Sequence, residues 1–552
     1  MTRCIHLSKW RLILLLSLLM VGLSVHAGNS NSALPTIISL LFDDDESPVI
    51  QVRLQASRTH CFSPCTVVFS ATETLDSSTP NEHERFRDLG YYFNFNDASS
   101  GDFATTGLSK NSQQGGPMAA HTFICQPDHP QYESGVCEFA VAVSARNALG
   151  DTGTAQILIT VDSPEHAFSE QDTICISTSG NYGGDMACPV NAERRTSMLA
   201  MGEFSGKRVL LRRGESFAEI CVNYSERNIL IEPFGNTADG RPVIEGSMYL
   251  GVDNCGDYLP ENNAEITNYG QTWTTNVTVT GLRVPDVGYG MSYSQVGVHD
   301  LDMNYYDESS GGTFAIASNG DRCLNDVDLD CENIPLPVGA YISETEIVGS
   351  ESGVLSVGVN IGGFNCPVIN WIGFVGNTVW NANEHNFRIE GFWRGVWSHN
   401  VMRGHHHNSG RKHTITLRSC GFDNIDPAVA VMRHNVPQNT AGAPYSRYAV
   451  VADNILGSAD STQASWKLQI APSNASSVET IVDAIAERNT FIDSTVSPSI
   501  DMALNGYYLT ARVNQIYTPS GQDCIATGPN LNPLWGQIEC AGPVPDVLVY
   551  EP

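Results

Sequence analysis

Short apolar runs alternate with polar residues through the first third of the chain. Between residues 48 and 163, the runs TVVFSAT (66–72), FAVAVSARN (139–147) and AQILITV (155–161) are separated by turn-forming stretches such as ALGDTG. Alternation puts successive side chains on opposite faces of a strand, so each run predicts a strand with one buried face. Several short strands at near-regular spacing predict a β-sandwich.

The periodicity changes between Ile174 and Ile516, where short strands recur with polar turns between them. Asparagine follows the end of several strands, with spacings of 23, 35, 19 and 35 residues, at Asn377, Asn400, Asn435, Asn454 and Asn489. Self-similarity of this kind in a strand-rich chain predicts a parallel β-helix. Stacked asparagine side chains can hydrogen-bond to their copies one coil away, so we interpret this column as structural.

Two strands of this region, NFRIEG (386–391) and HTITLR (413–418), align by their apolar positions. The alignment places Phe387 over Ile415 and Ile389 over Leu417 in the core, and the alternate residues must then point outward. The expected outward residues are Asn386, Arg388, Glu390, Thr414, Thr416 and Arg418, with Lys467 and Gln469 on a third strand. His399 and His434 are expected to share a column, each just before an asparagine of the ladder. Neighbouring coils lie about 4.8 Å apart, so the pattern predicts a groove lined by Arg, Lys and His.

Three segments of the first domain resemble the PKD family. Residues 93–97 (FNFND), 121–123 (HTF) and 141–147 (VAVSARN) are similar to the family patterns WDFGDG, HTY and VTLTVTN, with Asn94 and Ala98 as departures. The resemblance covers about 110 residues. It implies an immunoglobulin-like module found beside catalytic domains of exported carbohydrate-active enzymes and proteases, where it usually serves as a spacer.

The segment GKRVLLRRGESF (206–217) resembles the opening rung of right-handed β-helices of the pectate-lyase-like superfamily. The expected fold class is therefore all-β, an immunoglobulin-like (PKD) sandwich followed by a right-handed parallel β-helix. The expected boundaries are a signal peptide (1–27), a leader or linker (28–47), the sandwich (48–163), the β-helix (164–520) and a C-terminal capping tail (521–552).

The signal peptide is indicated by Arg3, Lys9 and Arg11 ahead of the apolar run LILLLSLLMVGL and a small residue at Ala27. Its removal takes the formal net charge from −30 to −33, because it deletes three basic residues and no acidic ones. This charge argues against nucleic acid or an anionic membrane as a general partner. No later apolar run is long enough to span a bilayer, so we expect a secreted or periplasmic monomer without membrane insertion.

Removal of the signal peptide also removes Cys4 and leaves fourteen cysteines, which in an exported chain favours disulfides. Spacing suggests the pairs Cys61–Cys65, Cys125–Cys137, Cys175–Cys188, Cys221–Cys255, Cys323–Cys331 and Cys524–Cys540, with Cys366–Cys420 left over.

The segment from His385 to Arg447 is cationic in this anionic chain. It holds eight Arg and Lys residues against three acidic ones, and seven of the fifteen histidines. Guanidinium groups bind carboxylates and sulfates in a bidentate fashion, so the predicted partner is an acidic polysaccharide. The expected substrate-binding residues are Arg388, Glu390, Arg394, Arg403, Arg433, Trp393 and Trp397.

The predicted reaction is β-elimination on a uronate-containing polysaccharide, catalysed by a polysaccharide lyase. Elimination needs a base, a cation that neutralises the uronate carboxylate and a proton donor. Lys412, flanked by Arg411 and His413, is the candidate base, because neighbouring cations lower the pKa of an ammonium group. Arg418 or Arg388 would hold the carboxylate, and His399 or His413 is the reserve proton-transfer group.

Two alternatives stay open: a non-catalytic glycan-binding or adhesive β-helix protein, and a β-helix glycoside hydrolase. Hydrolysis needs two carboxyl groups that flank the scissile bond, and the cationic segment has only Glu390, Asp423 and Asp426. No cofactor is indicated with certainty; Ca²⁺ remains open and the metal unknown, although no calcium loop appears and the run His405 to His407 could bind a transition metal.

Overall fold

The computed structural model describes residues 49–223, 226–246, 248–252, 276–284, 295–304, 312–316, 339–348, 357–361, 369–380, 385–390, 392–403, 414–419, 445–457, 468–472, 480–492, 500–502, 507–517 and 538–540. Residues 49–552 form one compact unit. The predicted signal peptide and leader lie outside the described residues. None of the helices in these ranges is long and apolar enough to cross a membrane.

The N-terminal part is a sandwich of mainly antiparallel strands, as predicted. One sheet has the order β3 (His60–Phe62), β11 (Thr152–Asp162), β10 (Val136–Arg146), β6 (Gly90–Asn94) and β7 (Ser112–Gly115), with β9 (Tyr132–Glu133) paired to β10. The second sheet has the order β2 (Gln55–Ala56), β4 (Cys65–Ser70) and β8 (Met118–Phe123). A short pair, β1 (Ile50–Gln51) and β5 (Leu75–Asp76), and helix α3 (Glu82–Asp88) complete it.

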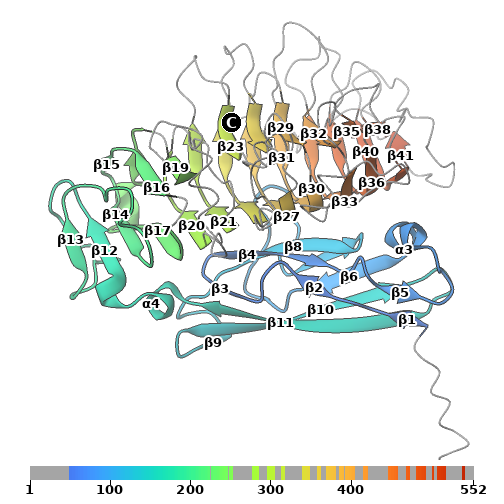
Figure 1. Ribbon diagram of the computed structural model, residues 1–552, viewed down its shortest axis with the longest axis horizontal. Helices are drawn as coiled ribbons and strands as arrows, with labels where there is room; N and C mark the ends of the chain where they lie inside the picture. Colours follow the sequence, from blue (N-terminus) through green and yellow to red (C-terminus); the bar gives the residue numbers. More distant parts are fainter. Residues whose placement is uncertain are drawn as a thin grey trace, which may run out of the picture. The chain divides into compact units, whose positions relative to one another are not determined.

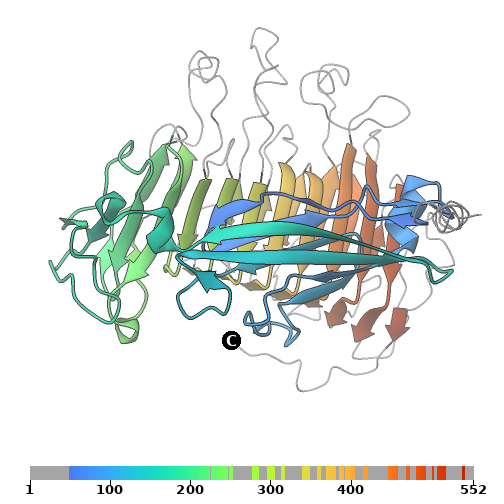
Figure 2. The same ribbon diagram turned by 90° about the horizontal axis from the view of Figure 1, so that it is seen from below.

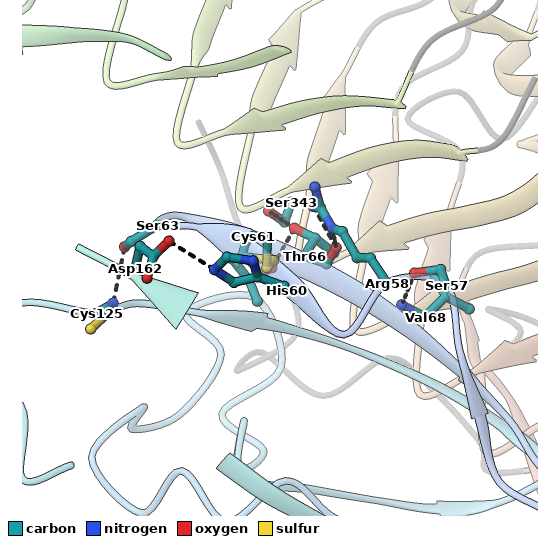
Figure 3. Close-up of a disulfide and its surroundings, with 12 residues drawn as sticks. Ser57, Arg58, His60, Cys61, Ser63, Thr66, Val68, Cys125, Asp162 and Ser343 are labelled. Atoms are coloured by element: carbon teal, nitrogen blue, oxygen red, sulfur yellow. Dashed lines mark hydrogen bonds and ion pairs between the residues drawn. A yellow bond between two sulfur atoms is a disulfide. The ribbon is translucent and has the colours of Figure 1, made fainter. Parts of the chain in front are cut away.

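The sandwich core is aromatic, with Phe69, Phe93, Phe95, Phe123 and Phe139 buried between the two sheets. Two predicted disulfides, Cys61–Cys65 and Cys125–Cys137, are confirmed, and Figure 3 shows the first beside the start of β4. Every residue of β4 and of β8 is buried, so both faces of this sheet are covered. One face packs on the sandwich core, and the other contacts the second part of the chain.

The second part is a parallel β-helix, which confirms the predicted fold class. Figure 1 shows its strands stacked in chain order from green to red, and Figure 2 shows the same stack turned by 90°. It begins after α4 (Pro164–Ala167) and the short helix η1 (Glu170–Asp172), and η2 (Thr237–Asp239) interrupts its first coils. Two small parallel pairs lie there as well: β15 (Ser216–Phe217) with β18 (Val243–Ile244), and β16 (Ile220–Asn223) with β19 (Met248–Val252).

Three parallel sheets run along the β-helix. Sheet I has the order β13 (Glu193–Arg195), β12 (Thr173–Ile176), β14 (Arg208–Arg212), β17 (Ile229–Phe234), β20 (Asn276–Thr280), β21 (Gln295–His299), β24 (Gly339–Ser343), β27 (Ile369–Val375), β30 (Phe392–Ser398), β33 (Tyr445–Ala452), β36 (Thr480–Glu487) and β39 (Tyr507–Arg512). Sheet II has the order β22 (Asp302–Asn304), β25 (Glu346–Val348), β28 (Thr378–Trp380), β31 (Val401–Arg403), β34 (Ile455–Gly457), β37 (Thr490–Ile492), β40 (Asn514–Tyr517) and β41 (Ile538–Cys540). Sheet III has the order β23 (Gly312–Ile316), β26 (Val357–Ile361), β29 (His385–Glu390), β32 (Ile415–Ser419), β35 (Leu468–Pro472) and β38 (Ile500–Met502).

The predicted core alignment of sheet III is confirmed, because Phe387 pairs with Ile415 and Ile389 pairs with Leu417. All four side chains lie in the β-helix core. Disulfide Cys175–Cys188 is also confirmed, and Cys221 is disulfide-bonded. Its predicted partner Cys255 lies outside the described residues, as do both members of the pairs Cys323–Cys331 and Cys366–Cys420, and Cys524.

The asparagine column is a hydrogen-bonded ladder. The Oδ1 atom of Asn400 accepts the backbone N–H of Asn377 at 2.8 Å, and the Oδ1 of Asn454 accepts that of Asn400 at 3.0 Å. The ladder continues to Asn489 and Asn514, and all five side chains are fully buried. Asn514 was not among the predicted members. The prediction for Asn435 is wrong, because Asn400 bonds directly to Asn454 across 54 residues of chain.

The sandwich packs against the outside of sheet I through a shared apolar cluster. From the sandwich it contains Val68, Phe86, Phe103, Met118 and Ala120, and from the β-helix Tyr341, Trp371, Val375, Val396, Tyr448, Val450, Ala452 and Ile485. The Oγ1 of Thr66 lies 3.1 Å from the Oγ of Ser343, a contact visible in Figure 3. A Cβ built on Gly373 would lie 3.1 Å from Val68, so the absence of a side chain allows β4 to approach closely. This sandwich is therefore joined to the β-helix by a packed interface, unlike the expected spacer.

Candidate functional site

The turn from sheet I to sheet II has the same conformation in successive coils. Its first residue has a positive φ, at Glu344 (50°), Gly376 (69°), His399 (58°), Asp453 (58°) and Arg488 (51°). From Gly376 to Arg488, the next residue is an asparagine of the ladder. We call these five positions the turn row. A left-handed residue costs energy for most side chains, and the ladder hydrogen bonds that follow hold it in place.

The turn row contacts the sandwich. The Nζ of Lys110 lies 2.7 Å from the Oε2 of Glu344, and the Nη2 of Arg488 donates to the backbone carbonyl of Gln114 at 2.6 Å. Between these polar contacts, Phe103 stacks on His399 with ring centroids 4.2 Å apart. The row therefore forms part of the interface.

His399 does not line an open groove, contrary to the sequence-based expectation. Its side chain is 3% exposed, and its Nδ1 lies 3.3 Å from the Oγ1 of Thr106. Burial, and to a smaller extent the charge of Arg488, lowers the pKa of His399 to about 3. The ring is therefore neutral at physiological pH and enclosed by the sandwich. The expected column of His399 and His434 is also wrong, because Ser398 pairs with Ala452 and puts Asp453 in the next turn.

Three expected sugar-binding residues near His399 are also packed inside the protein. Trp397 is fully buried in the β-helix core, where its ring meets the edges of Phe387 and Phe392. Arg394 stacks over Trp371 with its guanidinium carbon 4.7 Å from the ring centroid, and Trp393 packs partly buried beside it.

Arg394 also bonds across the interface. Its Nη2 donates to the Oε1 of Gln55 in the sandwich at 3.5 Å, and its Nη1 donates to the Oδ1 of Asn370 at 3.0 Å. Burial lowers the pKa of its guanidinium. Trp397 and Arg394 thus serve packing in this structure, which corrects their placement on an open surface.

Sheet III brings the remaining predicted residues together in register. Arg388 pairs with Thr416, and Glu390 pairs with Arg418 on the next strand. The first of these columns extends through Asn360, Gln469 and Asp501 on neighbouring coils. Arg388 is partly exposed, whereas for Glu390 and Arg418 the structure describes the backbone. One row of sheet III over five coils therefore holds Asn360, Arg388, Thr416, Gln469 and Asp501, and Glu390 and Arg418 belong to a second row.

The expected exposure of three polar residues of sheet III is wrong, and one of them, Thr416, is the partner of Arg388 in this row. Asn386, Thr414 and Thr416 are fully buried. The Nδ2 of Asn386 donates to the backbone carbonyl of Arg403 at 3.0 Å, so its amide satisfies a buried backbone group.

Arg403 lies on sheet II next to Trp380, and burial lowers the pKa of its guanidinium. The candidate base Lys412 lies outside the described residues, as do His413, Arg433, His434, Lys467 and the run His405 to His407. Among the described residues, no group of three His, Cys, Asp or Glu side chains is arranged to hold a metal ion.

Two buried acids join the sandwich to the β-helix and were not among the predicted residues. Glu487 is 2% exposed; its Oε1 accepts the backbone N–H of Gly116 at 2.6 Å and its Oε2 accepts Arg512 at 2.8 Å. Asp483 is fully buried and lies 2.7 Å from both His83 and Arg447. Acidic residues in the apolar strand TIVDAIAE are the sequence signal that could have indicated buried ion pairs.

Comparisons with known proteins return a distant likeness. No protein family matches the chain, and no curated protein matches it. Two solved structures of PfbA, a surface adhesin of Streptococcus pneumoniae, are similar over part of their length. The first is 12% identical and covers 56% of this chain and 78% of PfbA, with a TM-score of 0.32; the second is 12% identical and covers 59% and 82%, with a TM-score of 0.31. A likeness of this degree carries no function from one protein to the other.

Proposed function

We propose that this chain is an exported glycan-binding protein that holds an acidic polysaccharide along sheet III. The observation that carries the proposal is the register of Arg388 with Thr416 and of Glu390 with Arg418 on adjacent strands. Arg388 and Arg418 lie on adjacent coils, about 4.8 Å apart in the stacking direction and two residues apart along the strand, and guanidinium groups bind carboxylates or sulfates in a bidentate fashion. Disulfide-bonded cysteines in both parts of the chain favour an oxidising, extracellular location.

Binding without cleavage is the better supported form of this function. His399, one of the two candidates for the reserve proton-transfer group in elimination, is enclosed by Phe103 and has a pKa of about 3. A buried neutral imidazole of this kind cannot exchange protons with a polymer on the surface. The lyase reaction then depends on Lys412, Arg418 and His413, whose side chains lie outside the description.

The test is a binding and cleavage panel of alginate, pectate, glycosaminoglycan, ulvan and sulfated galactan. We expect binding that weakens as salt rises, without new ultraviolet absorbance or new reducing ends. Absorbance from an unsaturated uronide that disappears in Lys412→Ala would replace the binding proposal with the lyase. Reducing ends without that absorbance would indicate hydrolysis.

The double variant Arg388→Ala and Arg418→Ala removes the two arginines of the adjacent strands β29 and β32. A charge-assisted hydrogen bond contributes roughly 1.5–3 kcal/mol, so each lost contact should weaken binding about tenfold or more. The matched control is Arg146→Ala, an exposed arginine at the end of β10. Equal binding by parent, double variant and control would remove sheet III from the proposal.

A further inference from the structure

The loop between β6 and β7, residues 95–111, attaches the sandwich to the turn row. Backbone hydrogen bonds within it give it a defined shape: the N–H of Phe103 donates to the carbonyl of Leu108 at 2.8 Å, and the N–H of Lys110 donates to that of Gly101 at 2.9 Å. The Nζ of Lys110 lies 2.7 Å from the Oε2 of Glu344. All other printed side-chain contacts of this loop with the turn row are made to His399 and Gly376.

His399 is the centre of this contact. Phe103 stacks on its ring, the Oγ1 of Thr105 donates to its backbone carbonyl at 2.5 Å, and the Oγ1 of Thr106 lies 3.3 Å from its Nδ1. A Cβ built on Gly376 would lie 2.9 Å from Phe103, so the phenyl ring fits closely against the neighbouring coil as well. Three side chains of the loop therefore enclose one imidazole, which is 3% exposed.

The charged groups around His399 already have partners. The ion pairs that face it are Arg488 with Asp453 at 2.7 Å, Arg488 with Glu487 at 3.3 Å, and Lys110 with Glu344 at 2.7 Å. Of the two acids on the loop, Asp97 is bonded to His121 and His129, and Asp102 is exposed. In the described part of the chain, no carboxylate pairs with His399. A proton on this ring would therefore create a buried cation without a counterion, close to the guanidinium of Arg488.

Stacking on Phe103 does not compensate for this cost. Attraction between an imidazolium and the face of a phenyl ring would favour the charged form by at most about thirtyfold. Burial, and to a smaller extent the charge of Arg488, acts in the opposite direction and lowers the pKa of His399 from 6.5 to about 3. When the loop detaches, water reaches the ring, and the pKa returns toward its ordinary value of about 6.5. A proton thus binds more tightly when the loop is detached, so a fall in pH favours detachment.

We propose that acid releases the β6–β7 loop from the turn row, with His399 as the group that takes up the proton. The loop detaches as a unit because Phe103, Thr105 and Thr106 all contact this one residue. The sandwich itself stays attached through the apolar cluster around Val68 and Met118. The exported chain then presents a different surface in acidic surroundings, and this change is independent of polysaccharide binding on sheet III.

The test is hydrogen exchange of the full chain between about pH 7.5 and about pH 4.5, with rates corrected for the intrinsic effect of pH on exchange. We expect the protection factors of peptide 99–111 to be constant above about pH 6.5 and to fall about tenfold per pH unit below it. Peptide 136–146, which is strand β10 of the sandwich core, should keep its protection over the whole range.

Two variants separate the imidazole from the other polar anchor. His399→Asn removes the titrating ring, and asparagine tolerates the positive φ of 58° at this position, so protection of peptide 99–111 should vary less than about threefold with pH. Glu344→Gln removes the partner of Lys110 and should lower protection at every pH while keeping the tenfold dependence. The parent and Glu344→Gln decide the question if His399→Asn is unstable. Constant protection in the parent, an unchanged pH dependence in His399→Asn, its loss in Glu344→Gln, or a parallel fall in peptide 136–146 would overturn the proposal.

Discussion

Replacement of Asn400 by alanine removes the second of the five members of the ladder. Its Oδ1 accepts two hydrogen bonds from Asn377, from the backbone N–H at 2.8 Å and from Nδ2 at 3.1 Å. Its Nδ2 donates to the carbonyl of Phe374 at 2.9 Å and to the Oδ1 of Asn454 at 2.8 Å. The variant therefore removes four hydrogen bonds at a position that water does not reach.

Two buried polar groups that lose their partner determine how much stability the variant loses. The Asn377 N–H and the Phe374 carbonyl lose the partner that the side chain supplied, whereas Asn377 Nδ2 still donates to the carbonyl of Ile342 and Asn454 Oδ1 still accepts the N–H of Asn400. An unsatisfied buried polar group costs about 1–3 kcal/mol. With two such groups, Asn400→Ala should destabilise the surrounding coils by about 2–6 kcal/mol.

Hydrogen exchange followed by mass spectrometry is the appropriate assay, because a solenoid opens locally and a global transition averages over its coils. We expect peptides from 369–380 and 392–403 to exchange at least about thirtyfold, and up to about ten-thousandfold, faster than in the parent. Gln156→Ala, at an exposed position of β11, is the control and should change nothing. Exchange within threefold of the parent in both peptides would show that the ladder does not stabilise the coils as argued.

Three further predictions concern the interface. His399 has a pKa of about 3 in the folded protein, against about 6.5 in the unfolded chain. Its contribution to stability is therefore full above pH 6.5 and falls by about 1.4 kcal/mol per pH unit as the pH drops below 6.5. His399→Asn should reduce this dependence of the unfolding free energy on pH, as measured by denaturation curves. Gly376→Ala should lower Tm more than Gly180→Ala, because both have a positive φ but only the first would place a Cβ 2.9 Å from Phe103; equal losses would exclude that contact. Glu487→Gln leaves Arg512 without its carboxylate partner and should destabilise the protein by about 1–3 kcal/mol in urea, whereas an unchanged midpoint would mean that the pair contributes nothing.

The sequence predicts the β-helix well because its signals are local. Alternation fixes which side chains of NFRIEG and HTITLR enter the core, and the pairing of Phe387 with Ile415 follows from it. Three predicted disulfides are confirmed because their cysteines lie within 13 residues of each other. The predicted place of Asn435 in the ladder is wrong because Asn400 bonds directly to Asn454, although the chain between them is long enough for two coils.

The candidate site was harder to predict because it depends on what covers each face. The outward residues of sheet I include Val396, Val450 and Ile485, which a solvent-exposed face would not favour. Apolar residues on both faces of a strand indicate that both faces are covered, and this signal was present in FWRGVWS and in DAIAE. The strand pattern alone does not show that the sandwich covers His399, so this histidine is predicted from the sequence to be open to chemistry but is buried under Phe103.

The packed interface constrains how such a protein can evolve. The sandwich contacts five successive strands of sheet I, β24, β27, β30, β33 and β36, and so bridges five neighbouring coils. Gain or loss of one rung beneath it would displace every later contact by about 4.8 Å, out of step with the fixed sandwich. Segments between rungs already differ in length, with ladder separations of 23, 54, 35 and 25 residues. We therefore expect related chains to vary freely in the length of those connections while keeping constant the number of coils that contact the sandwich.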